Sequence, residues 1–369
     1  MFEANPWKAR LILVFLSFAF IEGFVRVLVG LGLLVHRTYP TSVEPQFWAY
    51  VDPVVGIWKR PEVTFRHIDK CFDVTYQSNS FGARDVERSL SSPAERRVVV
   101  LGDSFVEGFG IRDEDRLTNR LEQATGIEHL NFGASGNFSV VQQWLLYEAY
   151  AQKYDHSDVF VFILPYNDYR DNHPDRFDPD SYRPFLKHTG DDFEVWYPIE
   201  FENRDKSLRS ELARAKNAID NHLYISDQLR QAYDAMERLA DSRSVPHAPS
   251  YYDSFSEEDL QALLYTLKRV SEVAGDRNFY IFTIPVEKDL DYAEHNGTDF
   301  ALTKALRRFA DDRENTEFLD LTPAFVRYAE EHDISAADFT LGCDMHWNGL
   351  GNQVAAEAVS KLVYGTSEP

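Results

Sequence analysis

The chain has 369 residues, of which 44% are hydrophobic and 14% aromatic, so it can bury a sizeable core and global disorder is not expected. Its formal net charge is −22, and electrostatic repulsion therefore disfavours binding to nucleic acid. The sequence contains neither a CxxC motif nor a cysteine–histidine cluster at zinc spacing, which argues against a structural zinc site.

The first predicted element is an apolar helix. Residues 11–35 are mostly apolar and long enough to cross a bilayer. Glu22 and Arg26 interrupt this stretch and can pair on a helix, because they lie four residues apart. A cleaved signal peptide would have a shorter apolar core and a small-residue cleavage site, and a soluble amphipathic helix would carry more charge. We therefore expect residues 1–37 to be an uncleaved membrane anchor, in which the charged pair neutralises itself or meets a second copy of the helix.

The charges around this segment favour one orientation. Lys8 and Arg10 precede it and His36 and Arg37 follow it, but the next residues, 39–52, contain acids and no Lys or Arg. We expect a single-pass protein of the cytoplasmic membrane, with the rest of the chain facing the periplasm or the exterior. In such an oxidising compartment Cys71 and Cys343 can form a disulfide, and the alternative is two separate buried thiols.

Residues 38–95 are rich in proline, aromatic and polar residues, with short alternating runs such as 72–76, and they predict a linker with irregular β-structure.

The pattern changes in residues 96–369, where short apolar runs typical of buried parallel strands alternate with helical stretches. The predicted strands are 98–101, 129–132, 159–164, 279–284 and 317–320, and the predicted helices are 114–125, 140–153, 254–274 and 350–364. A capping box of Ser254 and Glu257 is expected to begin the third helix, and Gly365 to end the fourth. This alternation predicts a parallel sheet with helices on both faces.

Residues 172–253 do not follow this alternation. They contain a hairpin-like segment at 185–197 and a helical pattern across 208–239, so we interpret them as an insertion after the third strand. Because such sheets bind ligands at the carboxyl ends of their strands, the insertion is expected to shape the substrate site, and the alternative is a surface for a partner.

Two candidate loops follow the first and second strands. Residues 102–105, Gly-Asp-Ser-Phe, put Ser104 on a tight turn that can expose a nucleophile, although a helix N-cap explains this serine alone equally well. In the loop 131–137, Gly136 allows a backbone N–H group to approach a ligand, as an oxyanion hole requires. An ordinary flexible loop is the alternative for the second motif.

Two further loops follow the third strand and precede the last helix. The Asn167 amide can donate to an oxyanion, or it can form an Asx turn. His346 can act as the base, and Asp344 can orient it, since residues i and i+2 of an extended segment point the same way. Asp320 is a rival orienting acid, but a capping role before Pro323 suits it better, and a metal site would lack a third ligand.

These four loops, in this order and each next to a strand or helix end, resemble the sequence blocks of the SGNH (GDSL) hydrolase superfamily over residues 97–364. Further similarity in 130–147 and 167–172 is to a membrane-anchored bacterial branch of that superfamily. The resemblance implies a three-layer α/β/α sandwich around a five-stranded parallel sheet, of flavodoxin-like type. It implies no metal and no organic cofactor.

The resemblance also implies a role for each candidate. Ser104 would be the nucleophile and His346 the base, oriented by Asp344, while the Ser104 and Gly136 N–H groups and the Asn167 amide would form the oxyanion hole. Two positions depart from the superfamily pattern. Pro165 stands where the superfamily usually has glycine two residues before the block asparagine. The spacing Asp-x-His replaces the usual Asp-x-x-His and resembles SGNH-like acetyltransferases that modify exported polysaccharides.

We therefore expect a serine esterase that hydrolyses an acyl ester, on a small molecule or on a glycan or other envelope component, through an acyl-Ser104 intermediate. An O-acyltransferase that uses the same triad is the alternative. A catalytically silent envelope scaffold is a third reading, against which the intact triad argues.

Overall fold

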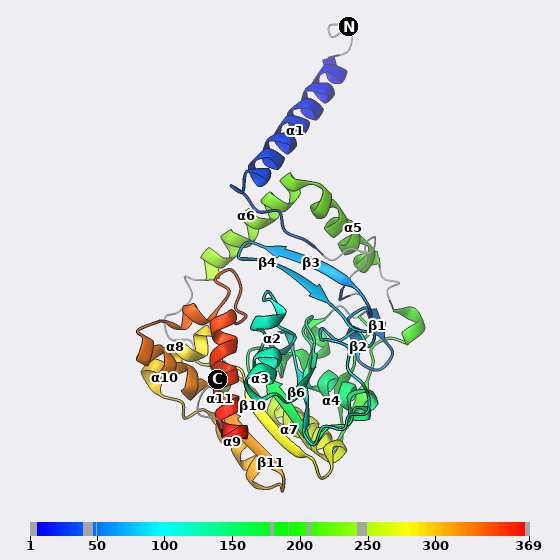
Figure 1. The fold of residues 1–369 in the computed structure, drawn as a ribbon. Coiled ribbons are helices and arrows are strands. Elements are labelled where there is room, and N and C mark those ends of the chain that lie inside the picture. The colour runs from blue at the N-terminus through cyan, green and yellow to red at the C-terminus, as the bar shows by residue number, and fades with distance from the viewer. Residues whose placement is uncertain are drawn as a thin grey trace.

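A computed structural model describes residues 6–39, 47–48, 50–177, 181–190, 192–204, 208–241 and 249–365 (Figure 1). Its centre is a five-stranded sheet in the order β11-β10-β7-β5-β6, with every neighbouring pair parallel. The strands are β5 Arg97–Gly102, β6 Glu128–Gly133, β7 Asp158–Ile163, β10 Asn278–Thr283 and β11 Thr316–Asp320. Each end lies within one residue of a predicted apolar run, and the predicted five-stranded parallel sheet is confirmed.

Helices cover both faces of this sheet, and they bury every residue of the inner strands β5, β7 and β10 except Asn278. On β5, Val98 and Val100 pack against one helical layer and Val99 and Leu101 against the other, as the alternation of side chains along a strand requires. The first layer contains α2 Ser104–Glu107, α3 Leu117–Thr125, α8 Glu287–Asn296, α10 Thr322–His332 and α11 Gly349–Tyr364. The second layer contains α4 Val140–Ala149, α7 Glu257–Ala274 and α9 Ala301–Asp311. The three-layer α/β/α prediction is therefore confirmed.

The ends of two helices test the capping predictions. At the start of α7 the capping box is formed by Ser256 and Asp259, two residues later than predicted, because the Ser256 hydroxyl accepts from Asp259 N–H at 3.1 Å and the Asp259 carboxylate accepts from Ser256 N–H at 2.8 Å. The predicted box of Ser254 and Glu257 is wrong. Helix α11 ends at Gly365 in a left-handed conformation, as predicted.

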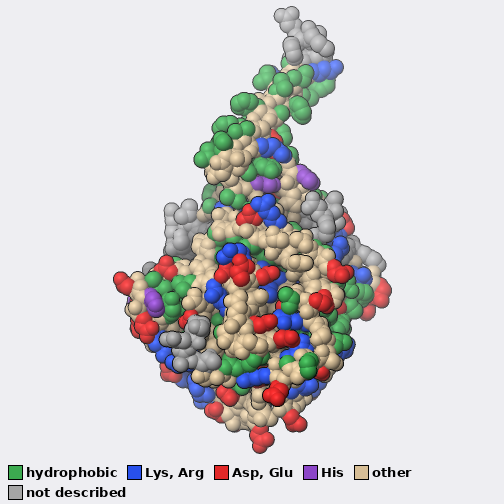
Figure 2. All heavy atoms as spheres, viewed as in Figure 1, with side chains coloured by type: hydrophobic (Ala, Val, Ile, Leu, Met, Phe, Trp, Pro, Cys, Tyr) green, Lys and Arg blue, Asp and Glu red, His purple; other side chains and the backbone are tan. Residues whose placement is uncertain are grey.

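The N-terminal helix α1, Pro6–Gly30, projects from the rest of the molecule (Figure 1). Its segment Trp7–Gly30 has a mean hydropathy of 2.3 and is long and apolar enough to cross a membrane, although a signal sequence can meet the same criteria. Figure 2 shows apolar side chains along this helix. The predicted pair forms, with Arg26 Nε 2.8 Å from Glu22 Oε1, and it also contacts the insertion, as described below.

Residues 38–95 form two antiparallel hairpins in their described part. They are β1 Tyr50–Asp52 with β2 Gly56–Trp58, and β3 Thr64–Asp69 with β4 Phe72–Gln77. Figure 1 shows β3 and β4 between α2 and the α5–α6 pair of the insertion. Cys71, at the turn between β3 and β4, forms a disulfide with Cys343, with 5.7 Å between their Cα atoms. Of the two alternatives that the sequence left open for these cysteines, the structure contains the disulfide.

The insertion supplies a hairpin and two helices. Strands β8 Phe185–Thr189 and β9 Asp192–Trp196 pair antiparallel, and helices α5 Leu208–His222 and α6 Tyr224–Asp241 meet beneath the base of α1 (Figure 1). The predicted domain boundaries remain a prediction. They divide the chain into 1–37, 38–95 and 96–369, with the insertion at 172–253.

Candidate active site

The nucleophile turn follows the central strand β5. Gly102 ends this strand and Ser104 begins the four-residue helix α2. The N-cap of α2 is Asp103, whose buried carboxylate accepts a hydrogen bond from Phe105 N–H at 2.9 Å. Capping is therefore done by the neighbouring aspartate, and the half-buried Ser104 hydroxyl is left at the carboxyl edge of the sheet.

Three of the predicted site residues form one hydrogen-bonded chain. His346 Nε2 lies 2.6 Å from Ser104 Oγ, and His346 Nδ1 bonds to Asp344 Oδ1. The same carboxylate oxygen accepts the backbone N–H of His346 at 2.9 Å, which fixes the two side chains relative to each other. With the hydrogen on Nδ1, Nε2 is free to accept the serine proton. The rival acid Asp320 lies elsewhere, where it accepts hydrogen bonds from Thr322 N–H and two threonine hydroxyls.

The surroundings of the imidazole are aromatic. The rings of Phe105 and Phe109 lie 4.7 and 4.5 Å from the His346 ring, measured between centroids. Burial opposes ionisation of Asp344, but the hydrogen bonds from His346 outweigh it, and the pKa of this carboxyl lies below its usual value. Burial lowers the pKa of the neighbouring His67 to about 4, so this second histidine is neutral at physiological pH.

The two predicted oxyanion donors lie on loops that flank the nucleophile turn, because β6 and β7 are the neighbours of β5 in the sheet. Gly136, with φ of +95°, and Asn137, with φ of +59°, form an exposed turn after β6. Asn167 follows β7 and is half-buried. Within the described part of the chain, neither Gly136 nor Asn167 forms a hydrogen bond with Ser104 or His346.

Two charged residues that the sequence did not single out hold the Gly136 loop in place. The Glu107 carboxylate accepts the Ser135 N–H and the Trp48 indole N–H, the latter at 2.9 Å. The fully buried Lys59 ammonium donates to the Gly133 carbonyl oxygen. Burial lowers the pKa of Lys59 to about 8, against the opposing effect of the Glu107 charge.

The end of β6 also packs directly on the nucleophile helix. A Cβ atom on Gly133 would lie 2.3 Å from the Glu107 backbone nitrogen and 2.7 Å from the Val106 carbonyl carbon. Since both neighbours are backbone atoms, only glycine permits this approach. The end of β6 and the nucleophile helix α2 are therefore in contact through their backbones.

Two buried acids lie beneath the site. Burial raises the pKa of Asp168 well above its usual value and the nearby Asp103 raises it further, while burial also raises the pKa of Asp103. Asp103 Oδ2 and Asp168 Oδ1 have no hydrogen-bond partner within the described residues. We therefore expect at least one of the two carboxyls to be protonated at neutral pH.

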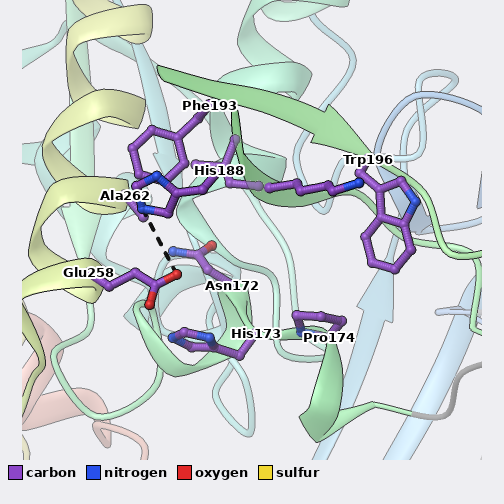
Figure 3. Close-up of a pocket in the computed structure, with 10 residues that line it drawn as sticks. Asn172, His173, Pro174, His188, Phe193, Trp196, Glu258 and Ala262 are labelled. Carbon is purple, nitrogen blue, oxygen red and sulfur yellow. Dashed lines mark ion pairs between the residues drawn. The ribbon is translucent and has the colours of Figure 1, made fainter. Parts of the chain in front are cut away.

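A cavity of about 390 Å³ lies between the β8–β9 hairpin and the first turns of α7 (Figure 3). Its lining residues include Asn172, Phe193 and Trp196. They also include His188 and Glu258, which form a pair with 4.0 Å between His188 Nε2 and Glu258 Oε1. The side-chain nitrogen and oxygen of Asn172 are buried and have no partner within the described residues.

The chain places this cavity close to Asn167. Asp171 N–H donates to the Asn167 carbonyl oxygen at 2.7 Å, and a 3₁₀ turn, Arg170–Asn172, follows, so Asn172 is about one helical turn from Asn167. Helix α7, which carries Glu258, runs back to the start of β10, and its first turn therefore lies at the carboxyl edge of the sheet. The cavity and the nucleophile turn share that edge.

Within the described part of the chain, no group of three or more His, Cys, Asp or Glu side chains could hold a metal ion. No family model and no curated protein matches the sequence. Solved structures do match it.

One of these structures is a member of the lipolytic protein G-D-S-L family from Veillonella parvula, with 13% identity, 73% of this chain and 100% of that chain covered, and a TM-score of 0.30. Another is a Clostridium thermocellum family 3 carbohydrate esterase, with 10% identity, coverages of 72% and 94%, and a TM-score of 0.36. A third is a Corynascus thermopiles carbohydrate esterase family 2 enzyme with a carbohydrate-binding domain, with 12% identity, coverages of 76% and 69%, and a TM-score of 0.37. G-D-S-L is the name of the superfamily that the sequence resembles.

Proposed function

We propose that this chain is an SGNH-type serine esterase that removes an acyl group from a carbohydrate or other envelope component through an acyl-Ser104 intermediate. The observation that supports the proposal most directly is the hydrogen-bonded chain from Ser104 Oγ through His346 to Asp344. A serine hydroxyl is a weak nucleophile unless a base takes its proton, and a histidine needs a carboxylate to fix its tautomer.

The proposed reaction has two halves. His346 Nε2 accepts the Ser104 proton while Oγ attacks the ester carbonyl carbon, and Asp344 stabilises the resulting imidazolium. The N–H groups of Ser104 and Gly136 and the Asn167 amide donate to the oxyanion. His346 then protonates the leaving alcohol, and in the second half it activates a water molecule that releases the acid and restores Ser104.

The cavity next to Asn167 supports a carbohydrate as the alcohol part of the substrate. The Trp196 side chain is 38% exposed, and an aromatic ring of this kind can pack against the apolar face of a sugar ring. The amide of Asn172 and the His188–Glu258 pair can supply polar contacts to hydroxyl groups. Aromatic surface with a few polar groups is the combination that a saccharide needs.

The second candidate is an O-acyltransferase, in which a sugar hydroxyl replaces water in the second half. The Asp-x-His spacing of Asp344 and His346 favours it.

We propose a single-pass protein of the cytoplasmic membrane with its catalytic part outside the cytoplasm, and the Cys71–Cys343 disulfide supports an oxidising compartment. The hydrogen-bonded triad argues against a silent scaffold.

The test uses the full-length protein in detergent and a short-chain activated ester. We expect hydrolysis, and we expect Ser104→Ala to lower kcat by several orders of magnitude because the nucleophile is lost. Ser91→Ala, at an exposed serine remote from the site, is the control and should leave kcat unchanged. A loss of only a few-fold in Ser104→Ala would contradict the proposed nucleophile.

The same preparation distinguishes the two candidates. With an acceptor oligosaccharide present, an esterase releases the free acid at an unchanged rate, whereas an acyltransferase forms acylated sugar at the expense of the free acid. Mass spectrometry of the oligosaccharide measures this partition.

A further inference from the structure

The α5–α6 hairpin of the insertion has apolar stripes on its outer faces. Leu212 and Ile219 on α5 are 60% and 51% exposed, and Leu229 and Met236 on α6 are 67% and 69% exposed. Residues seven apart lie on one side of a helix, so each pair forms a stripe. Exposed stripes of large apolar side chains mark surfaces that contact a lipid or a protein.

The opposite face of the hairpin is held by polar contacts to the segment that follows α1. Arg37 donates to Asp227 and Asp234, and the Tyr39 hydroxyl donates to Asp227 at 2.6 Å. Asp227 is fully buried by these groups. Because Asp227 and Leu229 lie on opposite sides of α6, the Leu229–Met236 stripe faces away from this segment.

The turn of the hairpin is attached to α1 itself. The Glu22 carboxylate accepts the N–H groups of Tyr224 and Ile225 at 3.1 and 3.0 Å, and the Arg26 guanidinium donates to the His222 carbonyl oxygen at 2.6 Å. The charged pair of the apolar helix is thus the docking point for the turn between α5 and α6. It also caps the amino end of α6, where a carboxylate is favourable.

These contacts fix the level of the hairpin relative to a membrane. A hydrocarbon core of about 30 Å needs a helix of about 20 residues, which is the length of Trp7–Arg26. Trp7 then lies at one interface, where tryptophan is favoured, and Arg26 lies at the other. The α5–α6 turn, bonded to Glu22 and Arg26, is therefore level with the second interface.

We propose that the α5–α6 hairpin lies in the interfacial layer of the same bilayer that α1 crosses, with its two apolar stripes in contact with lipid. The inference rests on α1 as a membrane span and is independent of the esterase activity. The two helices that carry the stripes meet at a turn bonded to the apolar helix α1, and amphipathic helices bind a membrane by placing one face at the boundary between headgroups and acyl chains.

Local charge opposes contact with a lipid surface only weakly. Although the chain has a formal net charge of −22, helix α5 contains Arg209, Arg214 and Lys216 against Glu211 and Asp220, and helix α6 contains Arg230 and Arg238 against Asp227, Asp234, Glu237 and Asp241. The hairpin therefore has a formal charge of −1, and its repulsion by anionic lipids is small.

The test is spin-label accessibility in full-length protein reconstituted into nanodiscs of phosphatidylcholine with one quarter phosphatidylglycerol. The two native cysteines form a disulfide, so Leu212→Cys, Leu229→Cys and Met236→Cys each provide a single free thiol for the label. Asp311→Cys, at the exposed end of α9, is the matched control in water. A circular dichroism spectrum and a thermal unfolding midpoint equal to those of the wild-type protein show that each labelled variant is folded.

We expect the ratio of oxygen accessibility to nickel-chelate accessibility to be severalfold higher at Leu212, Leu229 and Met236 than at Asp311. Ratios equal to that of the control would overturn the proposal, because the stripes would then face water. Spin–spin broadening that disappears on dilution with unlabelled protein would also overturn it and would assign the stripes to a second copy. Immobilised labels that neither reagent reaches would assign them to a protein partner.

Discussion

Glu107 lies three residues after the nucleophile, and its carboxylate accepts from Ser135 N–H and the Trp48 indole. In Glu107→Gln one of these donors meets an amide N–H group, so the loop that carries Gly136 loses a hydrogen bond. We expect kcat for a short-chain ester to fall by about 10–100-fold, equivalent to about 1.4–2.7 kcal/mol of transition-state stabilisation, with little change in KM.

The split between kcat and KM decides whether Glu107 positions the loop. Glu122→Gln is the control, because this partly exposed acid pairs with Arg88 and should leave both constants unchanged. A Glu107→Gln variant with native circular dichroism and unchanged kcat would rule out a positioning role. A loss of thermal stability with unchanged kcat per folded molecule would leave only a structural role.

Trp196 gives a second test at the level of single residues, this time of substrate class. Trp196→Ala removes the aromatic surface of the cavity next to Asn167, and a stacking contact is worth about 1 kcal/mol or slightly more. We expect KM for an acetylated xylo-oligosaccharide to rise about fivefold to tenfold, while kcat/KM for a small activated ester is unchanged. Tyr50→Ala, at an exposed aromatic residue outside this cavity, is the control. Equal effects on both substrates would contradict a saccharide subsite.

The Cys71–Cys343 disulfide acts between elements, since it joins the β3–β4 turn to the loop that carries Asp344 and His346. It closes a loop of 272 residues in sequence separation, and removing such a cross-link typically costs about 2–5 kcal/mol. We expect the double variant Cys71→Ala/Cys343→Ala to lose stability of this order and to have a lower kcat, because the base is no longer tied to the hairpin.

Urea unfolding and ester hydrolysis measure the two effects of the lost disulfide. Wild-type protein treated with a reducing agent should behave as the double variant does, and the double variant itself should not respond to that agent. Two reactive thiols in the untreated protein, or full activity in the double variant, would contradict this prediction.

At the scale of the whole molecule, strands were more predictable than helices. The five central strands are short apolar runs buried on both faces, and that composition is visible locally. Helices α8, α9 and α10 were not predicted, because helices of 10 or 11 residues gain most of their stability from packing on the sheet. The capping box of α7 was placed two residues early because the sequence offers two overlapping serine–acid pairs.

The same distinction applies to the candidate site. Ser104, Gly136 and Asn167 follow strand ends directly, so local patterns indicated them, and Asp344 and His346 lie two residues apart. Lys59 and Trp48 act from the N-terminal hairpin region, and no local pattern relates them to a loop more than 70 residues away. Glu107 carried a weak signal, since it lies one helical turn beyond the nucleophile.

Buried histidines couple the stability of the whole fold to pH. His129 is fully buried, with Nδ1 2.7 Å from the Ile127 carbonyl oxygen and Nε2 2.7 Å from the Tyr364 hydroxyl. Burial lowers its pKa from 6.5 to about 4, and His67 and His156 show the same shift. Between these pKa values the unfolded chain binds more protons than the folded one, so the stability due to neutral His129 is complete above about pH 6.5 and is lost as pH falls towards 4.

A comparison of wild-type protein with His129→Gln isolates this effect, because the other titrating groups are common to both. We expect the difference in unfolding free energy between them to shrink by roughly 2–4 kcal/mol between pH 7 and pH 4, since each unit of pKa shift corresponds to about 1.4 kcal/mol. Urea unfolding at several pH values measures this difference. A difference that stays constant over this range would mean that His129 gains its proton equally in the folded and unfolded states, and burial would then not govern its charge.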